Sequence, residues 1–329
     1  MVKERKGGIA MPSSHYLYTY ACHEDEASLC RLELKTLLQA QAEPRPGASV
    51  LRSGARVDPS RSPFIRERIE PICEGADFAE LMREASRLPP EERLSFKVVC
   101  LKTNDPTPGG KIEYEQRRKL EREAGAAIRG RVDVRRPDQV FGLVRCEGRW
   151  YLGPCESNRA IWLAHAKKPR DYSIALPTRV ARAVANLAAP QPEGIRAIDP
   201  CCGIGTVLVE ARSMGIDIVG RDINPLAVSG ARENLAHFGL AAEVSLGSIE
   251  DIREEYDAAV IDLPYNHVTR ISEDSERLIL REARRIARRA VVISHRDIAK
   301  ELAEAGFAIE DRCEARKGSS FVRHIAVCR

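Results

Sequence analysis

The chain of 329 residues has no apolar run long enough to cross a membrane. A membrane-spanning helix needs about 20 consecutive, mainly apolar residues, and no run in this sequence approaches that length. The basic start, residues 1–8, is not followed by the apolar core that a signal peptide requires. These two absences predict a cytoplasmic protein that does not bind to membranes.

Closely spaced pairs of metal-binding cysteines are also absent. The sequence has 10 cysteines and 7 histidines but no Cys-x-x-Cys pair. Cys22 and Cys30, like Cys146 and Cys155, lie too far apart for a zinc knuckle. We therefore expect no bound metal, and in a cytoplasmic chain the cysteines should be free thiols.

The sequence also lacks the third glycine of the dinucleotide-binding fingerprint. An apolar run, residues 195–198, ends at Asp199, and the chain turns through Gly203 and Gly205 before a helical pattern begins. Such a turn lets a ligand approach the backbone and the free N–H groups of a helix start, although it also occurs as a plain connection in α/β domains. Leu208 stands where the dinucleotide fingerprint has its third glycine, which disfavours a nicotinamide-dependent dehydrogenase.

The basic residues are concentrated in one segment. The net charge is only +4, yet residues 111–136 contain nine basic and five acidic side chains, an excess as large as that of the whole chain. One interpretation is a solvated helix with Glu–Arg pairs at helical spacing. The other is a surface that binds nucleic-acid phosphates.

The chain is long enough for two or three domains, and its pattern changes along its length. Alternating tyrosines predict a strand at residues 15–21, and apolar spacing predicts a helix at 26–39. The proline- and glycine-rich segment 43–63 predicts a loop or linker. From residue 195 strands and helices alternate, as in a parallel sheet with helices on both faces, and one of these helices is expected at 275–290.

A second motif follows the apolar run 258–261. Ligands of open parallel sheets bind beyond the carboxyl ends of the strands, so this motif should border the same crevice as the glycine turn. The carboxylate of Asp262 and the carbonyl of Leu263, which precedes Pro264, offer two acceptors for an exocyclic amine. Tyr265 offers a flat face for stacking a base. Alone, the same residues would also suit an ordinary turn.

Together, the two motifs resemble those of the THUMP-containing tRNA guanine-N2-methyltransferases. Asp199-Pro200-Cys201-Cys202-Gly203-Ile204-Gly205-Thr206 is similar to the Asp-Pro-x-Cys-Gly-x-Gly-Thr motif of that family. Residues 262–265 are similar to its (Asn/Asp)-Pro-Pro-(Tyr/Phe) motif. The charged helix, a short strand and Arg136-Pro137-Asp138 resemble the THUMP domain, an RNA-binding module.

This resemblance implies S-adenosylmethionine as the cofactor, tRNA as the partner and Asp222 as the residue that holds the cofactor ribose. The cofactor-binding residues that it implies are Asp199, Cys201, Gly203, Gly205, Thr206, Asp222, Ile223, Ser248, Ile249 and Asp262. The catalytic residues would be Asp262, Leu263, Pro264 and Tyr265. Contacts to RNA are expected from Arg117, Arg118, Arg129 and Arg135.

Two positions depart from the family pattern. Leu263 replaces a proline, and Ser248 stands where the family usually has an acid that contacts the adenine amine. An RNA-binding protein that has lost its methyltransferase activity therefore remains an alternative. DNA adenine-N6 methylation, which uses the same acceptor geometry, is a second alternative, although no DNA-reading domain is recognisable.

We expect an α/β fold: a Rossmann-like class I methyltransferase sheet with helices on both faces, preceded by an α+β region that contains a THUMP-like domain. The expected divisions are an N-terminal region at residues 1–60, the THUMP-like domain at 61–155, a connector at 156–175 and the methyltransferase domain at 176–329.

Overall fold

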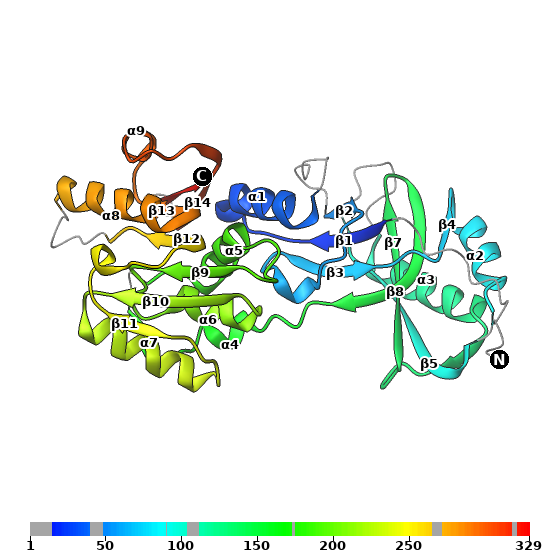
Figure 1. The fold of residues 1–329 in the computed structure, drawn as a ribbon. Helices are drawn as coiled ribbons and strands as arrows, with labels where there is room; N and C mark the ends of the chain where they lie inside the picture. Colours follow the sequence, from blue (N-terminus) through cyan, green and yellow to red (C-terminus); the bar gives the residue numbers. More distant parts are fainter. Residues whose placement is uncertain are drawn as a thin grey trace, which may run out of the picture. The chain divides into compact units, whose positions relative to one another are not determined.

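A computed structural model (Figure 1) describes residues 15–39, 49–89, 91–103, 112–172, 175–264, 272–317 and 321–329. The chain forms two compact units, each of them discontinuous in sequence. Unit 1 comprises Met1–Ala21, Leu38–Pro59 and Ile65–Asn158. Unit 2 comprises Cys22–Leu37, Ser60–Phe64 and Arg159–Arg329. No helix in the described part of the chain is long and apolar enough to cross a membrane.

Unit 1 is built on a mixed sheet with two helices. Its strands are β1 (Tyr16–Tyr20), β2 (Val50–Ser53), β3 (Ile65–Ile69), β4 (Cys73–Gly75), β5 (Glu91–Cys100), β6 (Gly130–Val132), β7 (Gln139–Cys146) and β8 (Arg149–Ser157). The strand order is β2-β1-β3-β8-β7-β5-β6, with β4 also paired to β8. The helices α2 (Phe78–Ser86) and α3 (Tyr114–Ala127) pack on this sheet through a core that includes Leu81, Phe96 and Ala124.

The structure confirms the strand at residues 15–21 and corrects the loop at 43–63. Tyr18 of β1 is fully buried and its hydroxyl donates to the Ala55 carbonyl over 2.7 Å. Within the expected loop, β2 pairs antiparallel with β1, and Leu51 lies opposite Tyr18. The strand was missed because its four residues form a stable ladder only against a partner distant in sequence.

Unit 2 contains a seven-stranded sheet of the order β11-β10-β9-β12-β13-β15-β14. Its strands are β9 (Arg196–Asp199), β10 (Asp217–Asp222), β11 (Val244–Leu246), β12 (Tyr256–Asp262), β13 (Ala287–Ser294), β14 (Ile309–Lys317) and β15 (Phe321–Cys328). Its helices are α1 (Ala27–Leu38), α4 (Trp162–His165), α5 (Thr178–Ala188), α6 (Thr206–Ser213), α7 (Pro225–His237), α8 (Glu273–Ile286) and α9 (Ala299–Glu304). The first five strands in chain order are parallel, and the last two form an antiparallel hairpin.

The strand order reverses at β9, which pairs with β10 on one side and with β12 on the other. In the ladder, Asp199 lies beside Gly220 of β10, and Ile198 lies beside Ala259 of β12. At such a reversal the connecting helices leave toward opposite faces, so the carboxyl ends of the two central strands border a crevice. The glycine turn and Asp262 both lie at this end of the sheet.

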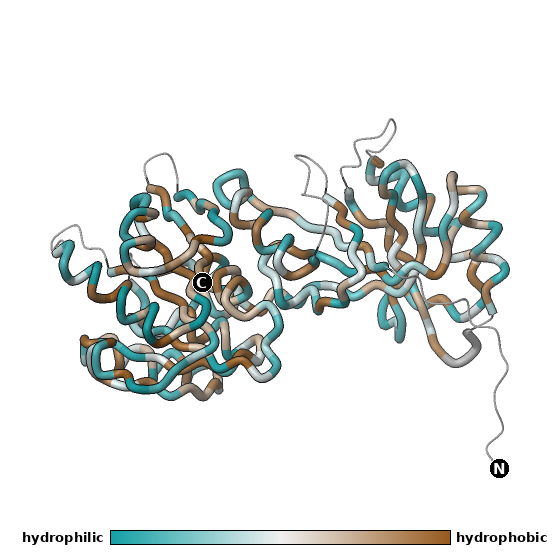
Figure 2. The backbone as a smooth tube through the Cα atoms, turned by 45° about the horizontal axis from the view of Figure 1, so that its top comes forward, coloured by the Kyte–Doolittle hydropathy of each residue, from teal (hydrophilic) through white to brown (hydrophobic). Residues whose placement is uncertain are grey.

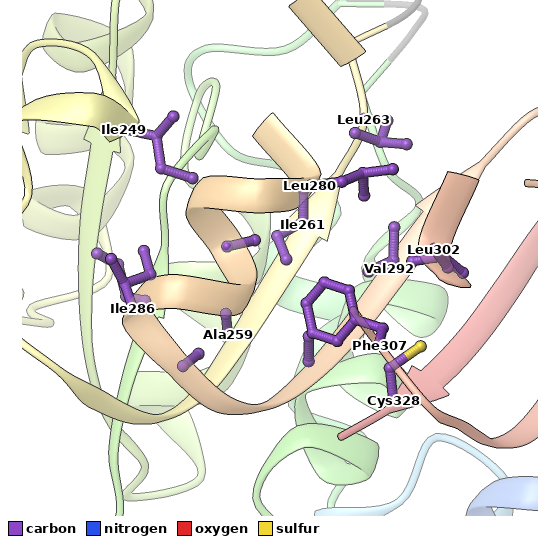
Figure 3. Packing of buried hydrophobic residues seen from close by; sticks show 14 of the residues in the cluster. Ile249, Ala259, Ile261, Leu263, Leu280, Ile286, Val292, Leu302, Phe307 and Cys328 are labelled. Carbon is purple, nitrogen blue, oxygen red and sulfur yellow. The ribbon is translucent and has the colours of Figure 1, made fainter. Parts of the chain in front are cut away.

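The helix expected at residues 275–290 ends earlier than the sequence indicated. Helix α8 stops at Ile286, and Ala287 begins β13 by pairing with Tyr256 of β12. Leu280 and Ile286 of α8 pack with Ile261 in one buried cluster (Figure 3). Hydrophobic and hydrophilic stretches alternate along the backbone in Figure 2. A short apolar run does not by itself distinguish a buried helix from a buried strand.

A buried polar cluster joins the early helix α1 to the rest of unit 2. Glu33 of α1 is fully buried and accepts hydrogen bonds from the Ser62 hydroxyl and from Asn186 of α5. Beside it, the Arg182 guanidinium donates to Glu210 of α6 over 2.6 Å and to the carbonyl of Ser60 over 2.6 Å. Since buried charges are stable only when they are paired, these contacts fix α1 and residues 60–64 to the sheet-bearing part of the unit.

Glu33 gives unit 2 a pH-dependent stability. Burial raises the pKa of its carboxyl from 4.5 to about 7, although hydrogen bonds from Ser62 and Asn186 oppose the rise. Between these two pH values the folded state binds more protons than the unfolded state, so the free energy of unfolding falls as the pH rises. From pH 5 to pH 8 this group should account for about 2 to 3 kcal/mol of that fall.

The variant Glu33→Gln should lose this dependence, which chemical denaturation at pH 5 and pH 8 measures. The control is Glu304→Gln, at an exposed side chain of α9. Parallel pH curves for Glu33→Gln and the wild type would show that Glu33 does not change protonation on folding.

Candidate active site

A cavity of about 720 Å³ lies at the carboxyl ends of β9, β10 and β12. Its described walls come from the segment before α5, the glycine turn, the ends of β10 and β12, the loop after β11 and helix α8. The lining residues expected from the sequence are Asp199, Cys201, Gly203, Thr206, Asp222, Ile223, Ser248, Ile249, Asp262, Leu263 and Pro264. Those that sequence reasoning missed include Tyr172, Leu176, Glu250 and Ile279.

The glycine turn has the shape that the sequence indicated. Gly203 and Gly205 have φ angles of 53° and 77°, in the left-handed region that favours glycine. A Cβ atom on Gly205 would lie only 3.0 Å from the Cβ of Ala231. Gly205 precedes α6 and does not line the cavity, whereas Gly203 does. The turn therefore presents backbone to a ligand on one side and packs against α7 on the other.

Asp222 connects the end of β10 to this turn. Its Oδ2 accepts a hydrogen bond from the Gly203 backbone over 2.8 Å, and its Oδ1 accepts one from the Asn224 backbone over 2.8 Å. The next side chain, Ile223, is 75% exposed and lines the cavity. Asp222 thus fixes the turn while its carboxylate remains at the cavity wall, where the two hydroxyls of a ribose could bind.

Burial raises the pKa of Asp199 and of the two cysteines of the turn. Asp199 is 2% exposed, and its pKa lies well above the usual value because of burial, with further rises from Asp262 and Asp222. Burial and the neighbouring Asp199 also raise the pKa of the Cys201 and Cys202 thiols. A thiol becomes a nucleophile or metal ligand when it is ionised, so these cysteines are unsuited to either role. Among the described residues there is no cluster of three or more potential metal ligands.

Asp262 ends β12 with an incompletely paired carboxylate. Its Oδ1 is buried, and no donor in the described chain lies within hydrogen-bond distance of that atom. Burial raises the pKa of this carboxyl to about 6, and the charge of Arg323 opposes the rise. A buried oxygen without a donor is costly, and Asp262 is one of the residues that line the cavity, so a ligand could supply that donor.

The residues after Asp262 have different environments. The Leu263 backbone N–H donates to the Ile293 carbonyl over 3.0 Å, and the Leu263 side chain belongs to the buried cluster of Figure 3. Leucine at this position therefore anchors the strand end in the core. Pro264 lines the cavity, and Tyr265 lies outside the described residues.

Ser248, which stands where the family that the chain resembles usually has an acid, caps a short helix. Its hydroxyl accepts from the Glu250 backbone, and Asp251 accepts from the Ser248 backbone, so the pair forms a capping box for the short 3-10 helix Ile249–Asp251. Glu250 is one of the residues that line the cavity. A carboxylate is thus present at this wall, two residues after the expected position.

The arginines expected to contact RNA lie in unit 1. Arg118 forms an ion pair with Glu121 one turn further along α3, over 2.6 Å. Arg117 lies over the ring of Tyr114, with its guanidinium carbon 6.0 Å from the ring centre. Arg129 and Arg135 flank β6, the edge strand of the sheet, and both side chains are exposed.

Comparison with known proteins identifies relatives of known activity. A family described as "RMKL-like, methyltransferase domain" matches residues 166–321. The chain is 30% identical over 227 residues to a tRNA (guanine(10)-N2)-dimethyltransferase of Pyrococcus abyssi, covering 63% of this chain and 68% of the relative. It is 34% identical over 173 residues to the protein of the same name from Methanothermobacter thermautotrophicus, covering 49% of this chain and 51% of that relative.

More distant matches cover smaller parts of their relatives or differ more in sequence. A U6 snRNA (guanine-N(2))-methyltransferase, THUMPD2, from Bos taurus is 32% identical over 120 residues, which are 34% of this chain and 24% of that protein. Among solved structures, TrmN from Thermus thermophilus is 19% identical, with a TM-score of 0.46, and the match covers 96% of this chain and 99% of that one.

The sheet order is that of a Rossmann-like fold, and the match over residues 166–321 places the chain in the class of S-adenosylmethionine-dependent methyltransferases. Within that class, the chain belongs to the family of the tRNA guanine-N2-methyltransferases. It spans about half the length of the Methanothermobacter relative that it matches.

Asp222 offers a direct test of the cofactor site. Replacing it by alanine removes charged acceptors, each worth about 1.5 to 3 kcal/mol, and also releases Gly203 and Asn224 from their hydrogen bonds. Asp222→Ala should therefore weaken S-adenosylmethionine binding at least about tenfold by isothermal calorimetry. The matched control is Asp217→Ala at the opposite end of β10, where the aspartate pairs with Arg212 over 2.6 Å. Equal affinities for the wild type and Asp222→Ala would exclude the assignment.

Proposed function

We propose that this protein transfers a methyl group from S-adenosylmethionine to an exocyclic amine of an RNA base, with N2 of guanine in cytoplasmic tRNA as the target. The observation that carries this proposal is the buried Oδ1 of Asp262, which lacks a donor within the described chain, at a residue that lines the cavity. The names of the guanine-N2-methyltransferases that the chain resembles support guanine as the base. Loss of activity and DNA adenine methylation stay as the alternatives that the experiments below must exclude.

Residues around the cavity suit the cofactor. The left-handed Gly203 lets a ligand reach the turn, Asp222 can accept hydrogen bonds from ribose hydroxyls, and Ile223 offers an apolar face for the adenine. Together with Ser248 and Ile249 they would hold the nucleoside part. When bound, S-adenosylmethionine supplies an electrophilic methyl group on a positively charged sulfur.

The protein's part in the chemistry is to orient the amine. A guanine amine is a poor nucleophile because its lone pair is delocalised into the ring. Asp262 and the carbonyl of Leu263 would accept its two hydrogens and so favour a geometry in which that pair is available. The neutral thiols of Cys201 and Cys202 support direct transfer to nitrogen without a covalent enzyme intermediate. Stacking of the base on Tyr265 remains part of this proposal.

Removal of the Asp262 carboxylate should reduce turnover more than cofactor binding. By analogy with the loss of one preorganised transition-state interaction, Asp262→Ala should raise the barrier by about 2 to 4 kcal/mol. Single-turnover methylation of unmodified tRNA measures the rate, and calorimetry should show S-adenosylmethionine affinity within about threefold of the wild type. The control is Asp257→Asn at the start of the same strand, where the aspartate accepts from the Arg196 backbone over 3.0 Å. A wild-type rate in Asp262→Ala would show that this carboxylate does not carry the reaction.

The reaction should also depend on the ionisation of Asp262. The ionised carboxylate accepts hydrogen bonds at both of its oxygens, whereas in the protonated acid one oxygen becomes a hydroxyl donor. With a pKa of about 6, the carboxyl is protonated below that pH, so the single-turnover rate should rise with pH through about 6 and then level off. Asp262→Asn should abolish this rise, and an unchanged pH profile in that variant would assign the ionisation to another group.

We propose further that unit 1 binds the tRNA through phosphate contacts around β6. Replacing an arginine that binds a phosphate should reduce the dependence of log affinity on log salt concentration by about 0.7 to 0.9. Filter binding of the full chain is measured between about 50 and 300 mM salt, where phosphate contacts dominate the affinity. The slope should be smaller for Arg129→Ala and Arg135→Ala than for the wild type. Arg149→Ala is the control, because Arg149 lies at the β7–β8 turn and pairs with Glu74 over 3.2 Å. Slopes identical to that of the control would place the RNA elsewhere.

A further inference from the structure

The segment just before α5 forms one wall of the cavity, although it is distant in sequence from both motifs. Tyr172 and Leu176 of this segment line the cavity. The Tyr172 hydroxyl lies 3.4 Å from the point that a Cβ of Gly203 would occupy. The backbone of Ile204 forms a hydrogen bond with the same hydroxyl. The phenol is therefore in contact with the glycine turn itself.

One buried side chain joins this segment to the turn. Asn234 of α7 is completely buried, and its Oδ1 accepts from the Arg170 backbone N–H over 2.9 Å. Its Nδ2 donates to the Arg170 carbonyl over 2.9 Å and to the Ile204 carbonyl over 2.9 Å. A single amide thus forms three hydrogen bonds to backbone groups that belong to two separate parts of the site.

The neighbouring surface of α7 is shaped to permit this arrangement. Gly230 lies one turn before Asn234, and a Cβ at that position would meet Ile204 at 3.1 Å and Arg170 at 3.6 Å. On the exposed side, Arg170 also forms an ion pair with Glu233 over 2.7 Å. Exposed pairs of this kind contribute little to stability, so the buried amide is the stronger of these two contacts between α7 and the segment.

We propose that Asn234 is a positioning residue of the cofactor site: it fixes residues 170–172 to the glycine turn and so holds the Tyr172 ring as a wall of the cavity. This inference rests on the proposed cofactor pocket and adds a residue that does not line it. Without the amide, the Arg170 and Ile204 carbonyls lose a donor, and the Tyr172 ring loses its fixed distance from Gly203. Binding of S-adenosylmethionine would then include the cost of ordering this wall.

The test compares the cofactor affinity and the thermal stability of the full chain in four variants. Asn234→Ala and Tyr172→Ala should each weaken S-adenosylmethionine binding about tenfold in calorimetry, a typical effect of leaving buried polar partners unpaired or of losing an aromatic wall. Tyr172→Phe should have a smaller effect, since it keeps the ring and loses only the hydrogen bond to Ile204.

The fourth variant is the matched control Asn186→Ala. Asn186 is equally buried in unit 2 but hydrogen-bonds to Glu33 and to the Arg61 carbonyl. It should lower the melting temperature and leave the affinity within about twofold, because its partners lie outside the cavity lining.

A double variant separates positioning from a general loss of structure. If Asn234 acts through Tyr172, Asn234→Ala combined with Tyr172→Ala should bind the cofactor no more weakly than the weaker single variant. Additive losses, or an Asn234→Ala affinity equal to that of the Asn186→Ala control, would overturn the proposal. Should Asn234→Ala fail to fold, Tyr172→Ala decides alone: unchanged affinity would reject Tyr172 as a wall, and with it the role of Asn234. Absence of binding by the wild-type chain would instead reject the cofactor pocket itself.

Discussion

The parallel pairing of β9 with both β10 and β12 is the constraint on which the site depends. The register of each strand pair fixes where along the sheet each strand ends and the following loop begins. Because of this register, Asp199, Asp222 and Asp262 end their strands around one cavity. The glycine turn can then reach Asp222 through the Gly203 backbone. A shift of the β9–β12 ladder would separate the proposed cofactor residues from the proposed catalytic carboxylate without any change in sequence.

Bringing three acidic side chains together has an electrostatic cost. This cost favours a positively charged ligand in the cavity. Burial and mutual repulsion raise the pKa of Asp199, and burial raises that of Asp262. No lysine or arginine is among the described residues that line the cavity. A positively charged ligand such as S-adenosylmethionine would offset the repulsion, whereas a neutral nucleoside would not. The acidic residues of the cavity lie in unit 2, whereas the exposed arginines around β6 lie in unit 1.

Unit 2 is assembled from segments that are far apart in the chain. Glu33 of α1, the carbonyls of residues 60 and 61, and Arg182 and Asn186 of α5 share one buried hydrogen-bonded cluster. Each partner removes a desolvation penalty from another, so deleting any one leaves a buried polar group unpaired. The early helix α1 is therefore as much a part of this unit as the helices that follow β9. Unit 2 therefore includes a helix that precedes most of unit 1 in the sequence.

The sequence by itself determined the glycine turn, Asp222 and the Asp262 motif, because strand ends, left-handed glycines and proline-bound turns follow from local chain chemistry. It also determined the alternation that makes a parallel sheet. Only the tertiary structure decided that β2 is a strand and that α8 gives way to β13 at Ala287, since a short apolar run takes its form from its partner. The same holds for the roles of Tyr172 and Asn234 in the site, because their contacts with Gly203 and Ile204 of the glycine turn depend on the packing of α7 and of the segment before α5.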